Sequence, residues 1–274
     1  MPERQLRPLG IGEVLDAAIK VYSRNALAMW KLVLAVIVPL AVIQEIVIGI
    51  SLPHGAFVHH GTLYTPNGQL STPALGAIVE IVLGILGPLI VNAALVLFVV
   101  DAYIDHPLDW GKSLRAAAGR LGSLLWLAIL NGVLVVLALI LLIIPGIWLS
   151  IAWCVSMPAL MFEHVGGVPA LRRSFRLVRH RWWPTFAAVV VAVIMLFVVE
   201  LIVGLIFSGI ESGLGVNSTG PWLVLNALST IIRNLITYPF IAAVISVLYI
   251  DLRVRKEGLD LELLARGPGA PIGE

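Results

Sequence analysis

Long apolar runs alternate with short polar segments along the whole chain. A helix needs about 17–25 mainly apolar residues to cross the roughly 30 Å hydrocarbon core of a bilayer, and six stretches reach that length. The pattern therefore predicts an all-α, polytopic membrane bundle of six transmembrane helices. The predicted spans cover residues 27–50, 74–100, 123–144, 146–162, 185–208 and 222–250.

The third and fourth predicted spans are separated only by Pro145 and Gly146. This dipeptide is a strong turn signal, so we expect a tight helical hairpin there and not one long helix. Prolines inside the spans remove a backbone donor and are expected to kink the helices. These are Pro39, Pro88, Pro158 and Pro239.

Small residues at four-residue spacing in the fifth span suit close packing of two helices. Ala188 with Ala192 forms one such pair, and Gly204 with Ser208 forms another. Both pairs are predicted to mark contact faces.

Basic residues gather in every second polar segment. The segments 51–73 and 209–221 contain no Lys or Arg. Because Lys and Arg stay on the cytoplasmic side, both termini are expected in the cytoplasm. The basic groups before spans one, three and five and after span six are Arg4, Arg7, Lys20 and Arg24; Lys112, Arg115 and Arg120; Arg172, Arg173, Arg176, Arg179 and Arg181; and Arg253, Arg255 and Lys256.

The cytoplasmic segments before spans one, three and five share a pattern that indicates a three-fold internal repeat. Each is predicted to form an amphipathic helix in the headgroup layer, where a basic face attracts anionic lipid. An ordinary interfacial role is enough to explain them. The shared feature is a leucine followed three residues later by a small residue, at Leu15 and Ala18, Leu114 and Ala117, and Leu171 and Ser174.

Composition agrees with a membrane environment. The chain is 59% hydrophobic and 12% charged, with a mean hydropathy of +1.00, whereas about a quarter of a soluble domain is charged. The net charge of +2 gives no indication of nucleic-acid binding, and the single Cys154 excludes a disulfide framework. We divide the chain into an N-terminal amphipathic segment (1–26), a membrane domain (27–250) and a cytoplasmic tail (251–274).

Polar groups inside the spans are the main candidate site residues, because a charge at mid-bilayer is costly. The candidates are Glu200, Arg233, Asn234 and Asn92. At 1.5 Å per residue, Glu200 and Arg233 lie at roughly similar depth and could form a structural ion pair. A transport or proton-relay role is the alternative. Glu45 and Glu80 lie closer to span ends, where water can reach them.

Catalytic and metal motifs are not found in the sequence. There is no phosphate-binding glycine loop ending in Gly-Lys-Ser/Thr and no Gly-x-Ser-x-Gly turn. The histidines His54, His59 and His60 share a loop without a carboxylate or cysteine ligand, so no metal site is predicted. We expect no enzymatic activity and no cofactor.

Three segments resemble the glycerophosphoryl diester phosphodiesterase membrane-domain family, particularly its standalone actinobacterial members. They are Arg7-Pro-Leu-Gly-Ile-Gly-Glu-Val-Leu-Asp16, Leu171-Arg-Arg-Ser-Phe-Arg-Leu-Val-Arg179 with Trp182-Trp183, and Leu248-Tyr-Ile-Asp-Leu-Arg-Val-Arg-Lys-Glu-Gly258. The resemblance implies a protein of the bacterial plasma membrane. In members that are phosphodiesterases, catalysis belongs to a separate metal-dependent barrel domain, which this sequence lacks.

These observations leave three functional hypotheses. The leading one is a non-enzymatic scaffold or accessory protein that binds membrane lipids or another membrane protein. The second is a transporter or lipid-handling protein with a polar intramembrane site. The third, which rests on family analogy alone, is a regulatory membrane domain for a separately encoded hydrolase.

Overall fold

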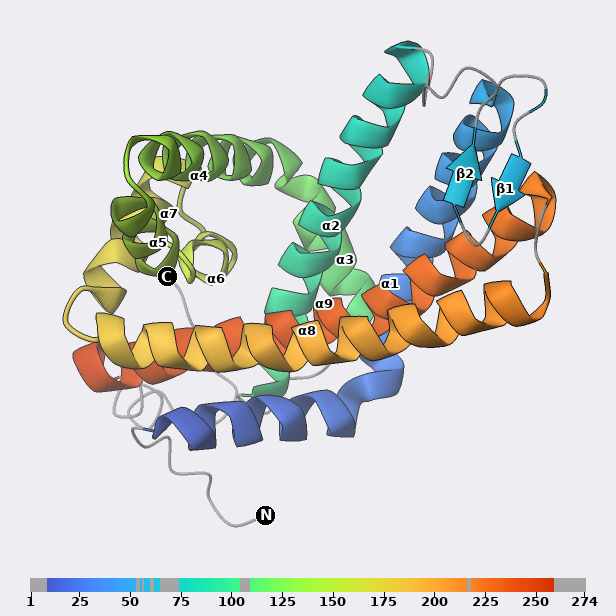
Figure 1. The fold of residues 1–274 in the computed structure, drawn as a ribbon. Helices are drawn as coiled ribbons and strands as arrows, with labels where there is room; N and C mark the ends of the chain where they lie inside the picture. Colours follow the sequence, from blue (N-terminus) through green and yellow to red (C-terminus); the bar gives the residue numbers. More distant parts are fainter. Residues whose placement is uncertain are drawn as a thin grey trace. The chain divides into compact units, whose positions relative to one another are not determined.

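A computed structural model describes residues 9–52, 55, 57–59, 62–64, 74–103, 109–215 and 218–258. Over these residues the chain is almost entirely helical (Figure 1). The helices are α1 (Ile11–Ser51), α2 (Ala74–Tyr103), α3 (Trp110–Gly119), α4 (Leu121–Leu141), α5 (Ile143–Ala152), α6 (Ser156–Phe162), α7 (Gly167–Val178), α8 (Trp182–Gly213) and α9 (Thr219–Glu257).

Six helical segments are long and apolar enough to cross a membrane, which confirms the all-α, polytopic membrane bundle. Large apolar side chains cover their outer surfaces; Ile140 is 78% exposed and Phe197 is 67% exposed. Such surfaces suit lipid and not water, so the chain is a multi-pass membrane protein. The segments are Ile11–Ile50, Ile81–Tyr103, Leu121–Leu141, Ile143–Phe162, Trp182–Gly213 and Thr219–Glu257.

A short β-hairpin lies in the segment between α1 and α2. Strands β1 (Phe57–His59) and β2 (Thr62–Tyr64) pair in antiparallel fashion, with Phe57 opposite Tyr64. The sequence interpretation did not predict it, although aromatic and β-branched residues favour strands. Of the loop histidines, His54, His60 and the side chain of His59 lie outside the described residues.

The chain divides into two compact units, and helices α1, α2, α8 and α9 each contribute to both. Two of the boundaries lie at prolines, Pro88 and Pro239. The first unit comprises Met1–Leu32, Leu89–Val193 and Pro239–Glu274, and the second comprises Val33–Pro88 and Ile194–Tyr238.

The three-fold repeat is visible in the packing of the first unit. Its three small residues, Ala18, Ala117 and Ser174, are all completely buried. A small side chain at this position lets each amphipathic helix lie close to its neighbours. The first copy differs from the others because α1 continues without a break from the amphipathic segment into the span.

The α4–α5 hairpin is confirmed, but its predicted turn is wrong. The helix is broken at Leu142, which has an extended backbone (φ −159°, ψ 133°). Pro145 and Gly146 instead lie in the first turn of α5, where a proline is tolerated. A Cβ atom at Gly146 would meet the side chain of Leu139 and lie 2.8 Å from its Cα. Gly146 therefore allows α5 to approach α4.

We expected a single helix in the fourth span, but the structure contains two there. A turn at Trp153–Val155 separates α5 from α6. Pro158 consequently lies in the first turn of α6, where it interrupts no helix interior, while Pro39, Pro88 and Pro239 are inside helices.

Of the two small-residue pairs in α8, one prediction is confirmed and one is wrong. Ala188 and Ala192 are buried. By contrast, Ser208 is exposed and a Cβ at Gly204 would meet nothing within 4 Å. Small residues at this spacing permit close packing but do not require it, and that part of α8 presents them outward.

Candidate functional site

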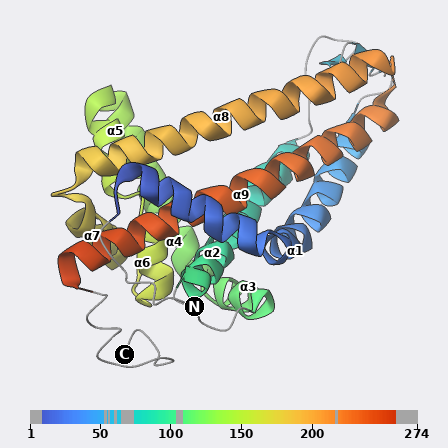
Figure 2. The same ribbon diagram turned by 90° about the horizontal axis from the view of Figure 1, so that it is seen from below.

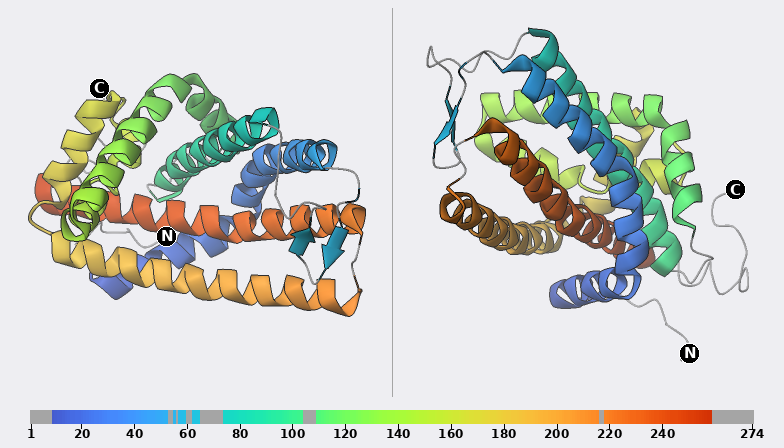
Figure 3. Two further views of the ribbon diagram at one scale, coloured as in Figure 1. Left: turned by 45° about the horizontal axis from the view of Figure 1, so that its top comes forward. Right: turned by 90° about the vertical axis from the view of Figure 1, so that its right-hand side faces the viewer.

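The second unit brings together two of the predicted site residues. The Nε atom of Arg233 lies 3.9 Å from Oε2 of Glu200. Thr237 donates a hydrogen bond to Oε1 of Glu200 at 2.8 Å, and Arg233 Nη2 donates to the hydroxyl of Ser229 at 2.9 Å. The contacts of Arg233 and Thr237 with Glu200 join α9 to α8, whose second-unit portions run side by side (Figure 3), whereas the Arg233–Ser229 bond lies within α9.

The Glu200–Arg233 cluster is open on one side, because both side chains are 37% exposed. Asn234 is half-buried in α9, and its side chain makes no hydrogen bond to another described residue. The fourth candidate, Asn92, is half-buried in α2 and belongs to the first unit. Glu45 also has a partner here, since Asn226 donates to its Oε1 at 2.7 Å.

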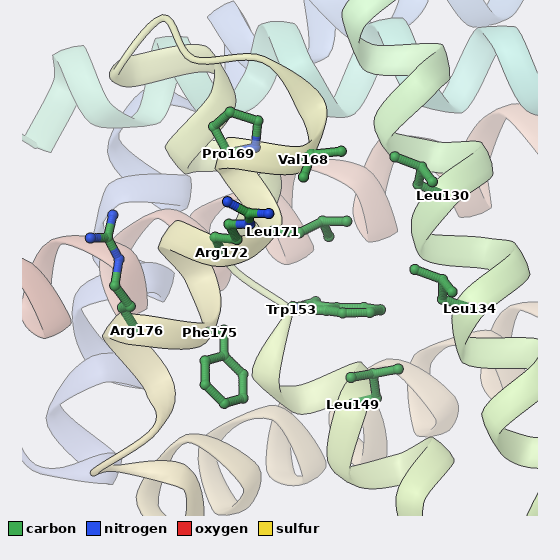
Figure 4. Close-up of a pocket in the computed structure, with 10 residues that line it drawn as sticks. All are labelled: Leu130, Leu134, Leu149, Trp153, Val168, Pro169, Leu171, Arg172, Phe175 and Arg176. Atoms are coloured by element: carbon green, nitrogen blue, oxygen red, sulfur yellow. The ribbon is translucent and has the colours of Figure 1, made fainter.

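A groove in the first unit is a candidate binding site. It has a volume of about 720 Å³ and lies between α4, α5 and α7 (Figure 4). That volume falls within the roughly 300–1,000 Å³ typical of ligand sites. Its apolar wall is formed by Leu130, Leu134, Leu149, Trp153, Val168 and Leu171.

Close packing positions α7 along this groove. A Cβ at Gly167 would lie 3.0 Å from Trp126 and 3.3 Å from the backbone nitrogen of Leu127, so the start of α7 rests directly on α4. Farther along α7, the buried hydroxyl of Ser174 donates to the Ala152 carbonyl of α5 at 2.9 Å. Helix α7 is thereby attached to both walls.

Aromatic residues close the opposite end of α7. Phe175 meets Trp148 edge to face, with ring centroids 5.6 Å apart. The indole nitrogen of Trp182, the first residue of α8, donates to the Trp148 carbonyl at 3.1 Å. These contacts hold α5 against the junction of α7 and α8.

Two arginines edge the groove. Arg172 and Arg176 both line it, are exposed, and have no ion-pair partner among the described residues. Their four-residue spacing places them on one face of α7. In Figure 4 their guanidinium groups lie on the opposite side of the view from Leu130, Leu134 and Leu149.

Arg173, which lies between them in sequence, has a different environment. Its Nε donates to both carboxylate oxygens of Glu163 at 2.8 Å, and its Nη2 donates to Glu257 at 2.6 Å. Tyr249 donates to Glu163 at 2.6 Å, and Arg253 pairs with Glu257 at 3.1 Å. This network ties α7 to the end of α6 and to the last turns of α9 (Figure 2).

The network holds Arg173 in its charged form. Its hydrogen bonds to Glu257, and then its contacts with Glu163, raise the pKa of the guanidinium above its usual value despite partial burial. The arginines of α7 therefore differ in environment. Arg173 is part of an ion-pair network, whereas Arg172 and Arg176 are exposed and pair with no carboxylate among the described residues.

The sequence interpretation recognised α7 as a basic amphipathic helix but did not find the groove. The available signal was the spacing of Val168, Arg172 and Arg176, which repeats every four residues on one face. The apolar wall could not be found in the same way, because it comes from three separate helices.

The described residues contain no group of three or more His, Cys, Asp or Glu side chains able to hold a metal ion. Comparisons with protein-family models, curated proteins and solved structures find no match for this chain.

Proposed function

We propose that this chain is a non-enzymatic accessory protein of the bacterial plasma membrane that recognises anionic lipid through α7. Both termini are in the cytoplasm in this proposal, which puts α7 at the cytoplasmic headgroup layer. The alternation of basic segments supports that orientation.

The observation that carries the proposal is a pair of exposed arginines at the groove, Arg172 and Arg176, which have no ion-pair partner among the described residues. A buried or paired arginine contributes to stability, but two exposed arginines four residues apart on a helix are suited to a phosphate. Arginine binds phosphate through two parallel hydrogen bonds, which a lysine cannot reproduce. The site lies on a helix attached to candidate spans, so membrane lipid is the nearest source of phosphate.

Anionic lipid is expected to stabilise the purified protein through these arginines. Phosphatidylglycerol added to protein in neutral detergent should raise the melting temperature by about 3–6 °C, because binding to the folded state alone stabilises it. Phosphatidylcholine should have a much smaller effect. The melting temperature followed by tryptophan fluorescence measures both.

The double variant Arg172→Gln/Arg176→Gln should lose most of the phosphatidylglycerol effect. The matched control is Arg115→Gln/Arg179→Gln, which removes two exposed arginines that do not line the groove. If both double variants lost the response equally, the effect would be general electrostatics and the proposal would be wrong.

A second candidate function, transport, is favoured by the exposure of the Glu200–Arg233 pair. Charged groups inside a membrane segment that are not sealed can serve as an ion pathway. Thr237 hydrogen-bonds the carboxylate, and Asn226 and Glu45 add polar groups in the same unit.

Proton flux would distinguish this candidate. In proteoliposomes containing a pH-sensitive dye, a transporter should dissipate an imposed pH gradient, and Glu200→Gln should reduce that rate at least about tenfold. The control Glu211→Gln removes an acidic residue near the end of the same helix, α8. No flux above that of empty liposomes would exclude a proton-coupled leak and leave the lipid-binding proposal as it stands.

A further inference from the structure

We infer that the groove between α4, α5 and α7 binds one anionic phospholipid molecule, with an acyl chain along its leucine wall and the phosphate at Arg172 and Arg176. This inference rests on the proposed function and extends it. It specifies a discrete site with a defined chain position, where the proposed function needs only an attraction between α7 and an anionic surface.

The polarity of the groove follows that of a lipid. Leu130, Leu134 and Leu149 belong to candidate membrane spans, whereas Arg172 and Arg176 belong to α7, which is not one. A molecule in the groove therefore contacts leucine side chains of α4 and α5 and arginine side chains of α7. Phospholipids combine an apolar and an anionic part.

The size of the groove favours a single small molecule. Its volume of about 720 Å³ is that of a ligand site. A stable protein partner would instead cover about 20–30 residues of this chain, more than the ten that line the groove. A free anion such as phosphate would use only the arginine edge and leave the apolar wall unused.

The apolar wall is also accessible. Leu134 is 39% exposed, and Trp153 and Leu149 are half-buried. Leu134 therefore offers a place to fill the groove without changing its charge. Leu137, on the same helix and 57% exposed, does not line the groove and serves as its control.

A phosphatidylglycerol that carries a photoreactive diazirine at the end of one acyl chain tests the inference. The full chain in neutral detergent is mixed with an equimolar amount of this probe, illuminated and digested. We expect crosslinked peptides from α4 and α5. Leu134→Trp should lower their yield at least about fivefold, and Leu137→Trp should leave it unchanged. Unlabelled phosphatidylglycerol should compete.

Three outcomes would overturn the inference. Equal competition by phosphatidylcholine would mean that the groove holds nonspecific boundary lipid. Competition by glycerol 3-phosphate at the same concentration would mean that it is a site for a free anion. An unchanged crosslinking yield in Leu134→Trp would mean that the acyl chain of the lipid binds outside the groove.

Failure of the inference can be separated from failure of the proposed function. Suppose that Arg172→Gln/Arg176→Gln loses the phosphatidylglycerol-dependent rise in melting temperature, whereas Leu134→Trp keeps both that rise and its crosslinks. Helix α7 then binds anionic headgroups, but no acyl chain lies in the groove. If that rise survives in the arginine double variant, the proposed function is wrong as well.

Discussion

Replacement of Arg173 by methionine is expected to lower the melting temperature of the purified protein by roughly 4–8 °C, which corresponds to about 2 kcal/mol. The substitution removes the cation that contacts both Glu163 and Glu257, and it leaves Arg253, at 4.0 Å and 3.1 Å, as their remaining positive partner. The Arg173 side chain is 16% exposed, and the side chains of its partners Glu163 and Glu257 are 19% and 31% exposed. Because Glu257 can be partly hydrated, the expected loss is smaller than that for a fully buried pair. Thermal unfolding in neutral detergent measures it.

The control is the adjacent residue. Arg172→Met removes the same charge from the same helix, but Arg172 is exposed and has no partner among the described residues, so its melting temperature should change by about 1 °C or less. The lipid response should show the reverse order. Arg172→Met should weaken stabilisation by phosphatidylglycerol, and Arg173→Met should retain it from a lower starting temperature. Equal effects at both positions would contradict the division of roles in α7.

The membrane architecture could be predicted because a bilayer imposes a simple rule. A segment that crosses hydrocarbon must be helical, about 20 residues long and apolar, and all three properties can be counted from the sequence. The helix ends were less predictable. Helix α1 begins at Ile11 because the predicted amphipathic helix before the first span joins that span without a break.

The turn between α4 and α5 shows where local signals mislead. Pro145 and Gly146 are typical turn residues, yet the chain reverses at Leu142. Proline is equally suited to the first turn of a helix, and glycine is equally suited to a close helix contact. Sequence alone cannot choose between these uses, since the choice depends on which residue of α4 lies opposite.

Some contacts between distant residues could be predicted from the sequence and others could not. Glu200 and Arg233 could be paired because both are charged and their depths could be calculated from helix rise. Glu163, Arg173 and Glu257 could not, since they lie outside the spans predicted from the sequence, where depth is no guide and charged residues are common. The groove required the relative positions of three helices, which no periodicity reports.

Substitution of Gly146 by alanine is expected to lower the melting temperature by roughly 4–9 °C. The added Cβ would meet the side chain of Leu139 and lie 2.8 Å from its Cα atom, so the backbones of α4 and α5 must separate. Overpacking of this kind costs about 1–3 kcal/mol, and contact with backbone favours the upper end because backbone cannot rotate away.

Gly132→Ala provides the matched control. Gly132 lies in α4, and a Cβ there would meet nothing within 4 Å, so the substitution should be neutral or slightly stabilising through helix propensity. The two variants should also differ in lipid binding. Separation of α4 from α5 moves Leu134 away from Leu149, the two sides of the apolar wall. At temperatures below the melting temperature of the variant, Gly146→Ala should therefore reduce crosslinking of the acyl-chain probe, whereas Gly132→Ala should preserve it. Full crosslinking in Gly146→Ala would mean that the α4–α5 hairpin does not shape the groove.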